Sequence, residues 1–592
     1  MTRRIVPWTV RIVILTLLTL PIASPLFVPL SLCPFVPSSS IASVPSLYET
    51  IQTLSQSGDR TTGAPGCDAA ADYIEDRFKA LGLESVGTQR FSLPVRRFTV
   101  GAKNFSSLPT LPENNVEADI HPLIANAISP GTIPREGIEG PLVYVGQGEL
   151  RAFDGKEIRD AVILMEMDSG KNWMHAVNLG AAALIYIDRG DASAAFFRDK
   201  EELTPVSFPR FWIDLEKAKD LFGDFKGAAD GRVAGAVKLQ CDIRWTETTG
   251  RNIYGLIPGA DETLKDELLI VEAFYDSSGW VGGRSPGADE ALSVATLLDL
   301  ADHLMRHPPG RSVLLTATGG HAQGLAGARE MFWALTAKSD ALKAEKATLE
   351  GVIETAGGHI ATLETALAEG VSAVSGEGAL KAALEERIKT EVDIISRRLM
   401  RLRIESEGQV EEAVIDRLAE KRIQLRRLGW RPHFKDLTDA ETTALAELIP
   451  LAIKDHEALR SDAKRQKALL KEAKAFRSLV REREVAAVVS LHLSSHGDGI
   501  GAFNRGWLYD LRERVDRIGP YSIIDDVLRS AGKALPDDCP LHDTLRPSRR
   551  RPWDTYLPDH PAMGGGGEFH GRIRGRDPGH GQRRPEPLGD AP

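Results

Sequence analysis

The sequence predicts an α/β protein: a mostly parallel sheet flanked by helices, with an inserted α/β domain and a long helical insertion. Residues 268–333 run from an apolar strand through a polar loop and an apolar-periodic helix to a second strand, which is a β-α-β unit. Several short apolar runs precede this unit at the spacing of strands. Residues 337–484 are rich in Ala, Leu, Glu, Lys and Arg and show 4-3 apolar spacing, which favours long packed or coiled helices.

Composition is that of a globular protein with several domains. The chain has 592 residues, of which 42% are hydrophobic, and a net charge of −10. This acidic balance gives no reason to expect nucleic acid as a partner. The four cysteines are widely spaced, which indicates neither a zinc ribbon nor a dense disulfide framework and leaves open one long-range disulfide after export: Cys33, Cys67, Cys241 and Cys539.

The first 42 residues have the pattern of a targeting segment. Arg3, Arg4 and Arg11 precede an apolar run at residues 12–36, and basic residues before an apolar core are typical of signal peptides. The run is also long enough to span a bilayer if it is retained. We therefore expect an exported protein, whether periplasmic, extracellular or membrane-anchored, and both cleavage and anchoring stay open.

Within the β-α-β unit, polar residues follow each predicted strand. The strand at 268–271 leads to Asp276, a loop then brings Asp289 to the start of the helix at 291–305, and the strand at 312–317 is followed by His321. The apolar strand that begins at residue 485 leads to His492. Sheets of this class place their sites at the carboxyl ends of the strands. We therefore expect these four polar residues to lie near one another.

These motifs resemble metallopeptidase family 28, the co-catalytic zinc aminopeptidases related to glutamate carboxypeptidase and the transferrin receptor. That family reads roughly A-H-Y-D-S, P-G-A-D-D-N and E-E-x-G-L-x-G-S. This chain has A-F-Y-D-S at 273–277, P-G-A-D-E-A at 286–291 and H-A-Q-G-L-A-G-A at 321–328. The resemblance implies a zinc-aminopeptidase-like fold. It also implies that residues 112–245, with their short strands, are a protease-associated (PA) domain inserted before the core.

The resemblance also shows which positions keep the chemistry of the family. Asp289 retains the place of the bridging aspartate, and Asp276 retains that of the partner of the first histidine ligand.

The remaining positions are replaced. Phe274 stands at the first histidine, His321 at the general-base glutamate, Ala322 at the glutamate ligand beside it, and His492 at the later aspartate. A terminal histidine has no convincing match. A dinuclear zinc site needs about five ligands and an acceptor for the proton of the bridging water, so these replacements should abolish it.

Two functions from different classes remain. The first is an exported, non-catalytic member that needs no cofactor and binds a peptide or protein partner, with no nucleic acid and with membrane contact only through the N-terminal segment. The second is an active zinc aminopeptidase of unusual ligation, in which Asp289, His321 and His492 hold one zinc ion and His321 accepts a proton. Three polar side chains that share hydrogen bonds would give the same sequence pattern.

The expected domains follow from these observations: 1–42 signal peptide or anchor, 43–111 first part of the peptidase-like core, 112–245 PA-like domain, 246–336 core with the site, 337–484 helical coiled-coil-like insertion, 485–562 return of the core and 563–592 tail. In the tail, a run of four glycines at 564–567 is followed by no apolar periodicity. We expect either an out-of-frame end or a genuine disordered tail there, and translation of the other reading frames distinguishes them.

Overall fold

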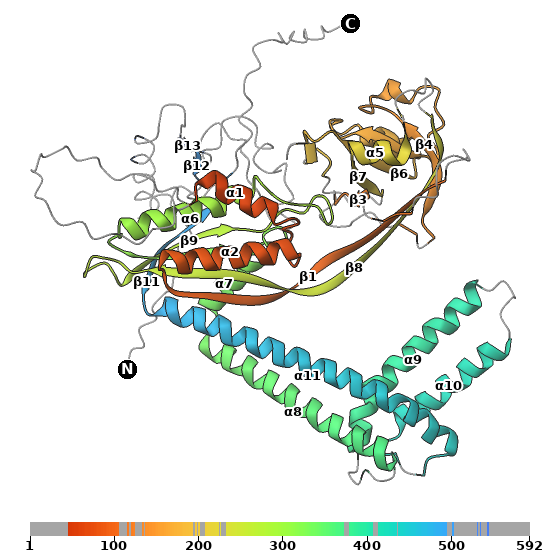
Figure 1. Cartoon of the computed structure of the whole chain (residues 1–592). Helices are drawn as coiled ribbons and strands as arrows, with labels where there is room; N and C mark the ends of the chain where they lie inside the picture. Colours follow the sequence, from red (N-terminus) through yellow and green to blue (C-terminus); the bar gives the residue numbers. More distant parts are fainter. Residues whose placement is uncertain are drawn as a thin grey trace, which may run out of the picture. The chain divides into compact units, whose positions relative to one another are not determined.

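The computed structural model describes most of residues 45–493, together with residues 500–502, 530, 533 and 541–543 (Figure 1). Its longest gaps before residue 493 cover 106–114, 125–132, 202–207, 226–231 and 406–411. The expected targeting segment at 1–42 and the tail at 563–592 lie outside the described residues. No helix in the described part of the chain combines the length and hydropathy needed to cross a membrane. The chain divides into two units, Trp333–Ser478 and the remainder.

An 11-stranded sheet forms the first unit, in the order β11-β9-β10-β8-β4-β5-β6-β7-β3, with β1 and β2 off this path. The longest strands are β1 (Glu84–Phe105) and β8 (Arg232–Ile257), which pair antiparallel as a ribbon. The other edge of β8 pairs with β10 near its end and with β4 near its start. Because β8 is one continuous strand, the expected domain boundary at 245/246 falls inside it.

The β-α-β unit occupies the opposite end of this sheet from the insert. Strand β9 (Glu267–Phe274) lies between β10 (Ser312–Thr318) and β11 (Glu484–Leu491), and both pairings are parallel. Helix α6 (Ala291–Arg306) joins β9 to β10, and α7 (Ala326–Thr336) follows β10. The mixed α/β class that the sequence predicts is confirmed, and antiparallel pairings of β8 with β1, β10 and β4 accompany the parallel ones.

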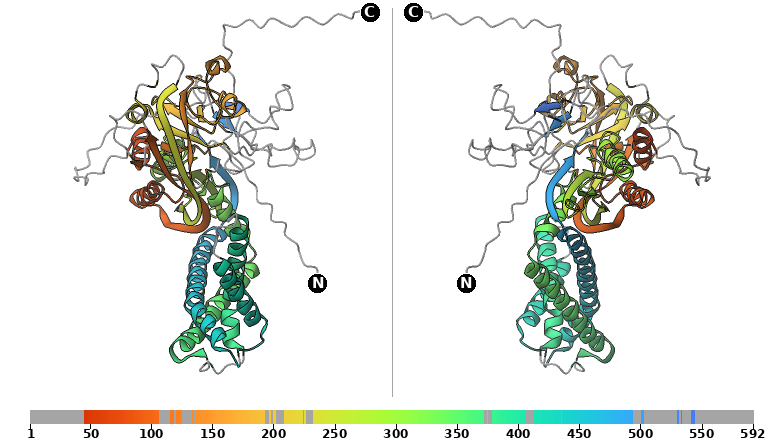
Figure 2. Two further views of the ribbon diagram at one scale, coloured as in Figure 1. Left: turned by 90° about the vertical axis from the view of Figure 1, so that its right-hand side faces the viewer. Right: turned by 90° about the vertical axis from the view of Figure 1, so that its left-hand side faces the viewer.

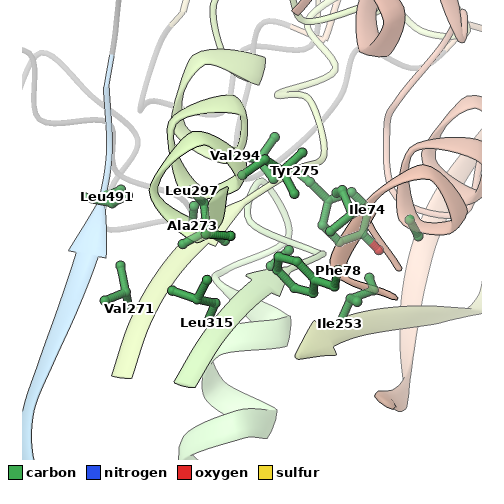
Figure 3. Packing of buried hydrophobic residues seen from close by; sticks show 14 of the residues in the cluster. Ile74, Phe78, Ile253, Val271, Ala273, Tyr275, Val294, Leu297, Leu315 and Leu491 are labelled. Carbon is green, nitrogen blue, oxygen red and sulfur yellow. The ribbon is translucent and has the colours of Figure 1, made fainter. Parts of the chain in front are cut away.

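One face of β9, β10 and β11 carries the main hydrophobic core (Figure 3). Helices α1 (Leu47–Gln56), α2 (Pro65–Leu81) and α6 bury apolar side chains against it. Helix α2 begins with Pro65 in its first turn and is capped after Leu81 by Gly82, whose φ of 83° is left-handed and suits glycine. Each fully buried Leu, Ile, Val or Phe side chain contributes about 1.5–3 kcal/mol.

The insert is a smaller α/β region with a hydrophobic cluster on each face of its strands. Strands β4, β5, β6 and β7 are parallel, and β3 closes the edge antiparallel to β7. Its elements are β2 (Asn115–Glu117), β3 (Ile120–Pro122), β4 (Ile138–Tyr144), η1 (Leu150–Phe153), β5 (Val162–Glu166), α3 (Trp173–Asn178), β6 (Ala183–Asp188), β7 (Arg210–Asp214) and α5 (Leu215–Phe222).

The second unit is helical. It contains α8 (Ser339–Glu369), α9 (Ala379–Glu405), α10 (Glu412–Trp430) and most of α11 (Asp439–Arg481). Within it, α9 and α10 lie side by side, and both pack on α11 through one apolar cluster that includes Ile388, Leu425 and Leu445 (Figures 1 and 2). Four residues of the apolar seam expected in α9 are buried, Leu384, Ile388, Ile395 and Leu399, and the other two, Val392 and Leu402, are partly buried. A short parallel pair, β12 (Ile500–Ala502) with β13 (Leu541–Asp543), follows later in the chain.

Candidate functional site

Three aromatic rings meet where β9, β10 and β11 end. The ring centroids of Phe274 and His321 are 3.9 Å apart and stacked, with an interplanar angle of 17°. The His492 ring stands edge-on to both, with its centroid 5.0 Å from that of Phe274 and 5.1 Å from that of His321. Phe274 is only 3% exposed. Phe274, His321 and His492 therefore form a cluster of three contacting rings, which we call the three-ring cluster, at the ends of these strands.

Strand register explains this meeting. Phe274 is the last residue of β9 and lies beside Thr318, the last residue of β10. The final pair between β9 and β11 joins Ala273 to Leu491, so His492 follows at the level of Phe274. Leu493 then donates its N–H to the hydroxyl of Ser293 on α6 at 2.8 Å, which holds the chain directly after His492.

Asp276 fixes the backbone of the turn that carries His321. The His321 N–H donates to both carboxylate oxygens of Asp276, at 3.1 and 3.0 Å. The Thr62 hydroxyl lies 2.9 Å from Asp276 Oδ2 and 2.8 Å from Gln323 Oε1, and it accepts the Gly320 N–H at 3.1 Å. Asp276 thus holds the backbone of His321.

The same turn is fixed from its other side by Asn252, which is 1% exposed. Its side-chain nitrogen donates to the Gly327 carbonyl at 2.9 Å, and its side-chain oxygen accepts the Gly319 N–H at 3.3 Å. A Cβ at Gly327 would lie 2.2 Å from the Gly319 carbonyl oxygen, so this close approach requires glycine. Gly320 has a φ of 70°, a left-handed conformation that also favours glycine.

Asp289 lies half-buried in the turn before α6. The loop ahead of it is held by Arg60, which is fully buried and donates through Nε to the Pro286 carbonyl at 2.8 Å and through Nη2 to the Gly287 carbonyl. Burial lowers the pKa of Arg60, whereas the charges of Glu290 and Asp276 raise it. Arg60 therefore donates hydrogen bonds to the loop before Asp289, and its charge also interacts with that of Asp276.

A buried carboxylate that was not predicted from the sequence, that of Glu272, lies on β9 two residues before Phe274. Glu272 is 7% exposed and accepts hydrogen bonds from Thr318 Oγ1 on β10 and Ser490 Oγ on β11. Burial raises its pKa, and the two hydroxyl donors and the charge of His492 act in the opposite direction. The signal was available, because Glu272 is the single acid within an otherwise apolar strand at 268–274.

Of the sequence-predicted site residues, the structure brings the rings of His321 and His492 together and joins Asp276 to the backbone of His321. Their catalytic and metal-binding roles stay predictions. Among the residues that the structure describes, no group of three or more His, Cys, Asp or Glu side chains could hold a metal ion. Phe274, which cannot ligate, contacts both imidazoles and is stacked on that of His321. The described residues therefore do not fit a co-catalytic zinc pair.

Asp276 makes stability depend on pH. It is 1% exposed, and burial raises its pKa from 3.8 to about 6, against the lowering effect of the His321 N–H and the Thr62 hydroxyl. Because the folded protein holds this proton more tightly than the unfolded chain, the contribution of Asp276 to stability is largest below pH 4. It falls by about 3 kcal/mol as pH rises through 6.

In an Asp276→Asn protein we expect this component of the pH dependence to vanish. Denaturant unfolding at pH 4.5 and 7.5 measures it, and Asp299→Asn, at an exposed position on α6, is the matched control. An Asp276→Asn protein that loses as much stability between these pH values as the unsubstituted chain would contradict the assignment.

Comparison with known proteins agrees with the motifs. Residues 252–355 match the model of peptidase family M28. No curated protein matches the chain.

Among solved structures, similar proteins include an aminopeptidase from Aneurinibacillus sp. strain AM-1, with 22% identity over 50% of this chain and 67% of that one and a TM-score of 0.27. The zinc aminopeptidase BSAP from Bacillus subtilis has 22% identity over 50% and 66%, with a TM-score of 0.31. The peptidase M28 precursor from Shewanella amazonensis SB2B has 19% identity over 49% and 66%, with a TM-score of 0.33.

The matched region begins at Asn252, contains β9, α6 and β10, and ends in α8. It includes the predicted site residues Asp276, Asp289 and His321, whereas His492 lies beyond it. Residues 252–355 of this chain are therefore similar to peptidase family M28.

Proposed function

We propose that this chain is an exported, non-catalytic peptidase family M28-like protein that acts by binding a peptide or protein partner. The observation that carries the proposal is the three-ring cluster, in which Phe274, at the position of the family's first histidine ligand, packs against both His321 and His492. A buried apolar ring at this position gives a metal no electron pair and keeps the imidazoles in ring contacts. Hydrolysis by this family's chemistry needs an activated water, and the described residues supply no metal group to activate it.

Separate features support export and binding. Arg3, Arg4 and Arg11 ahead of the apolar residues 12–36 support export. The insert at 112–245 resembles a PA domain, which in the family shapes access to the site. Its strands and the helices of residues 339–481 offer surfaces for a peptide or protein partner, and the net charge of −10 gives no support for nucleic acid.

Metal content and turnover test the proposal together. The purified full chain should contain well under one zinc per molecule by elemental analysis. Aminoacyl-nitroanilide and dipeptide substrates should not be turned over above background, with or without added zinc or cobalt. Stoichiometric zinc that is lost in His321→Ala and His492→Ala, with chelator-sensitive activity abolished by Asp289→Asn, would overturn it.

That opposite result would establish the second candidate function, an active aminopeptidase with one zinc ion held by Asp289, His321 and His492. The observation that favours it is the 5.1 Å separation of the two imidazole centroids, because two imidazoles and a carboxylate suit zinc. In that enzyme His321 could not serve as both ligand and proton acceptor at one nitrogen. Its pH-rate profile would then show which role His321 takes.

A further inference from the structure

Helix α9 has a second patterned face in addition to its buried seam. Residues 394, 397, 401 and 404 follow 3-4-3 spacing and therefore line one side of the helix. Ile394 is 46% exposed, Met400, beside this line, is 65% exposed, and Ile404 is 69% exposed. We call Ile394, Arg397, Met400, Arg401 and Ile404 the outward stripe. Its residues are all exposed, whereas the seam residues Ile395 and Leu399 pack against the rest of the helical unit.

The arginines of the outward stripe form no ion pair within the part of the chain that the structure describes. Arg397 and Arg401 are exposed, and neither forms an ion pair or side-chain hydrogen bond with another residue that the structure describes. Arg398 and Arg403 on the same two turns are exposed as well. Other charges of this unit are paired, for example Arg387 with Glu391 and Lys421 with Glu447. Among the described residues, none pairs with the positive charges of the stripe, and its apolar side chains are exposed.

We propose that the outward stripe of α9 is a docking surface for an anionic phospholipid membrane. Guanidinium groups pair with lipid phosphates while their aliphatic stems, and the interleaved Ile and Met side chains, enter the boundary with the acyl chains. The opposite face of α9 already packs in the helical unit, so docking carries no conformational-entropy cost for forming the helix. This adds a membrane contact to the one that the sequence alone predicts at the N-terminal segment.

Two other occupants fit less well. A second copy paired through the same stripe in antiparallel fashion would place Arg397 opposite Arg401 of its partner, and like charges in contact are unfavourable. A stable protein interface buries about 800 Å² on each side around an apolar centre. Three apolar side chains separated by arginines do not provide such a centre, but they do suit a lipid interface, where charge and apolar contacts alternate at every turn.

Site-specific photocrosslinking in the full chain tests the proposal independently of the N-terminal segment. Photoreactive p-benzoylphenylalanine is placed at Met400 and, as a control, at Leu459 of α11, which is 50% exposed. Vesicles contain phosphatidylcholine alone or phosphatidylcholine with phosphatidylglycerol. We expect lipid adducts at position 400 that require phosphatidylglycerol and exceed those at position 459 at least tenfold.

Charge variants complete the experiment. Each basic residue near an anionic surface contributes about fivefold to binding, so Arg397→Gln with Arg401→Gln should lower the adduct yield at position 400 by roughly 25-fold. Lys464→Gln with Lys471→Gln removes the same charge from exposed positions on α11 and should leave the yield unchanged. Three results would each overturn the proposal: equal adduct yields at positions 400 and 459, a yield at position 400 that is unchanged in the double arginine variant, or adducts to a second chain in place of lipid. Circular dichroism verifies that the variants are folded.

Discussion

A Phe274→His protein is expected to bind one zinc ion per chain, whereas the unsubstituted chain is expected to purify with well under one. The substitution places a third imidazole beside His321 and His492, whose ring centroids lie 3.9 and 5.0 Å from that of Phe274. Three imidazoles with an open fourth position are a familiar zinc ligand set. Elemental analysis after exhaustive dialysis, and titration of the metal-free protein with zinc, measure the gain.

Two controls assign this gain to the ring cluster. Phe274→Leu keeps the site apolar and should bind no more zinc than the unsubstituted chain, and His492→Ala in the Phe274→His background should lose the gain. If Phe274→His folds and binds no zinc, Phe274 is not the residue that excludes the metal. The lost ligand at Ala322, or strand-end geometry, would then be the cause.

Replacement of Arg60 by Met is expected to lower the free energy of unfolding by about 3–5 kcal/mol. Arg60 is fully buried, and its guanidinium donates to the carbonyls of Pro286 and Gly287. Methionine fills similar volume but leaves both carbonyls without these donors. It also leaves Glu290, which is 8% exposed, without this nearby positive charge. Denaturant unfolding of the full chain measures the loss.

The matched comparison is Arg244→Met, at an exposed ion pair with Asp242, which should change stability by less than about 1 kcal/mol. Arg60→Lys keeps the charge without the two-pronged hydrogen bonding and should fall between these results. A loss at Arg60→Met no larger than that at Arg244→Met would show that the Asp276 and Asp289 loops do not depend on this residue.

Local signals in the sequence were sufficient for the elements of the core. The apolar run at 268–271, the periodic helix at 291–305 and the strand at 312–317 correspond to β9, α6 and β10 within a few residues. Their patterns are strong because each element buries residues at its own period, so local sequence and packing agree. The helices of residues 339–481 could be predicted from the sequence for the same reason.

The β1–β8 ribbon was not anticipated. Its strands carry Arg, Thr, Glu and Asp among apolar residues, as at 242–251, so no single local run marks their full length. Pairing over twenty residues satisfies the backbone hydrogen bonds and extends both strands beyond what their side chains predict. For this reason the expected boundary at 245/246 fell within a strand.

For the site, the sequence by itself determined the inventory: which family positions are kept at Asp276 and Asp289, and which are replaced at Phe274, His321 and His492. These are chemical identities, and no folding is needed to know that phenylalanine cannot ligate a metal. Only the tertiary structure decided that the rings of Phe274, His321 and His492 pack into one cluster, and that Arg60 and Asp276 hold the surrounding loops. Those contacts join residues up to 227 positions apart in the chain, and their distances follow from strand register and burial, which a local pattern does not specify.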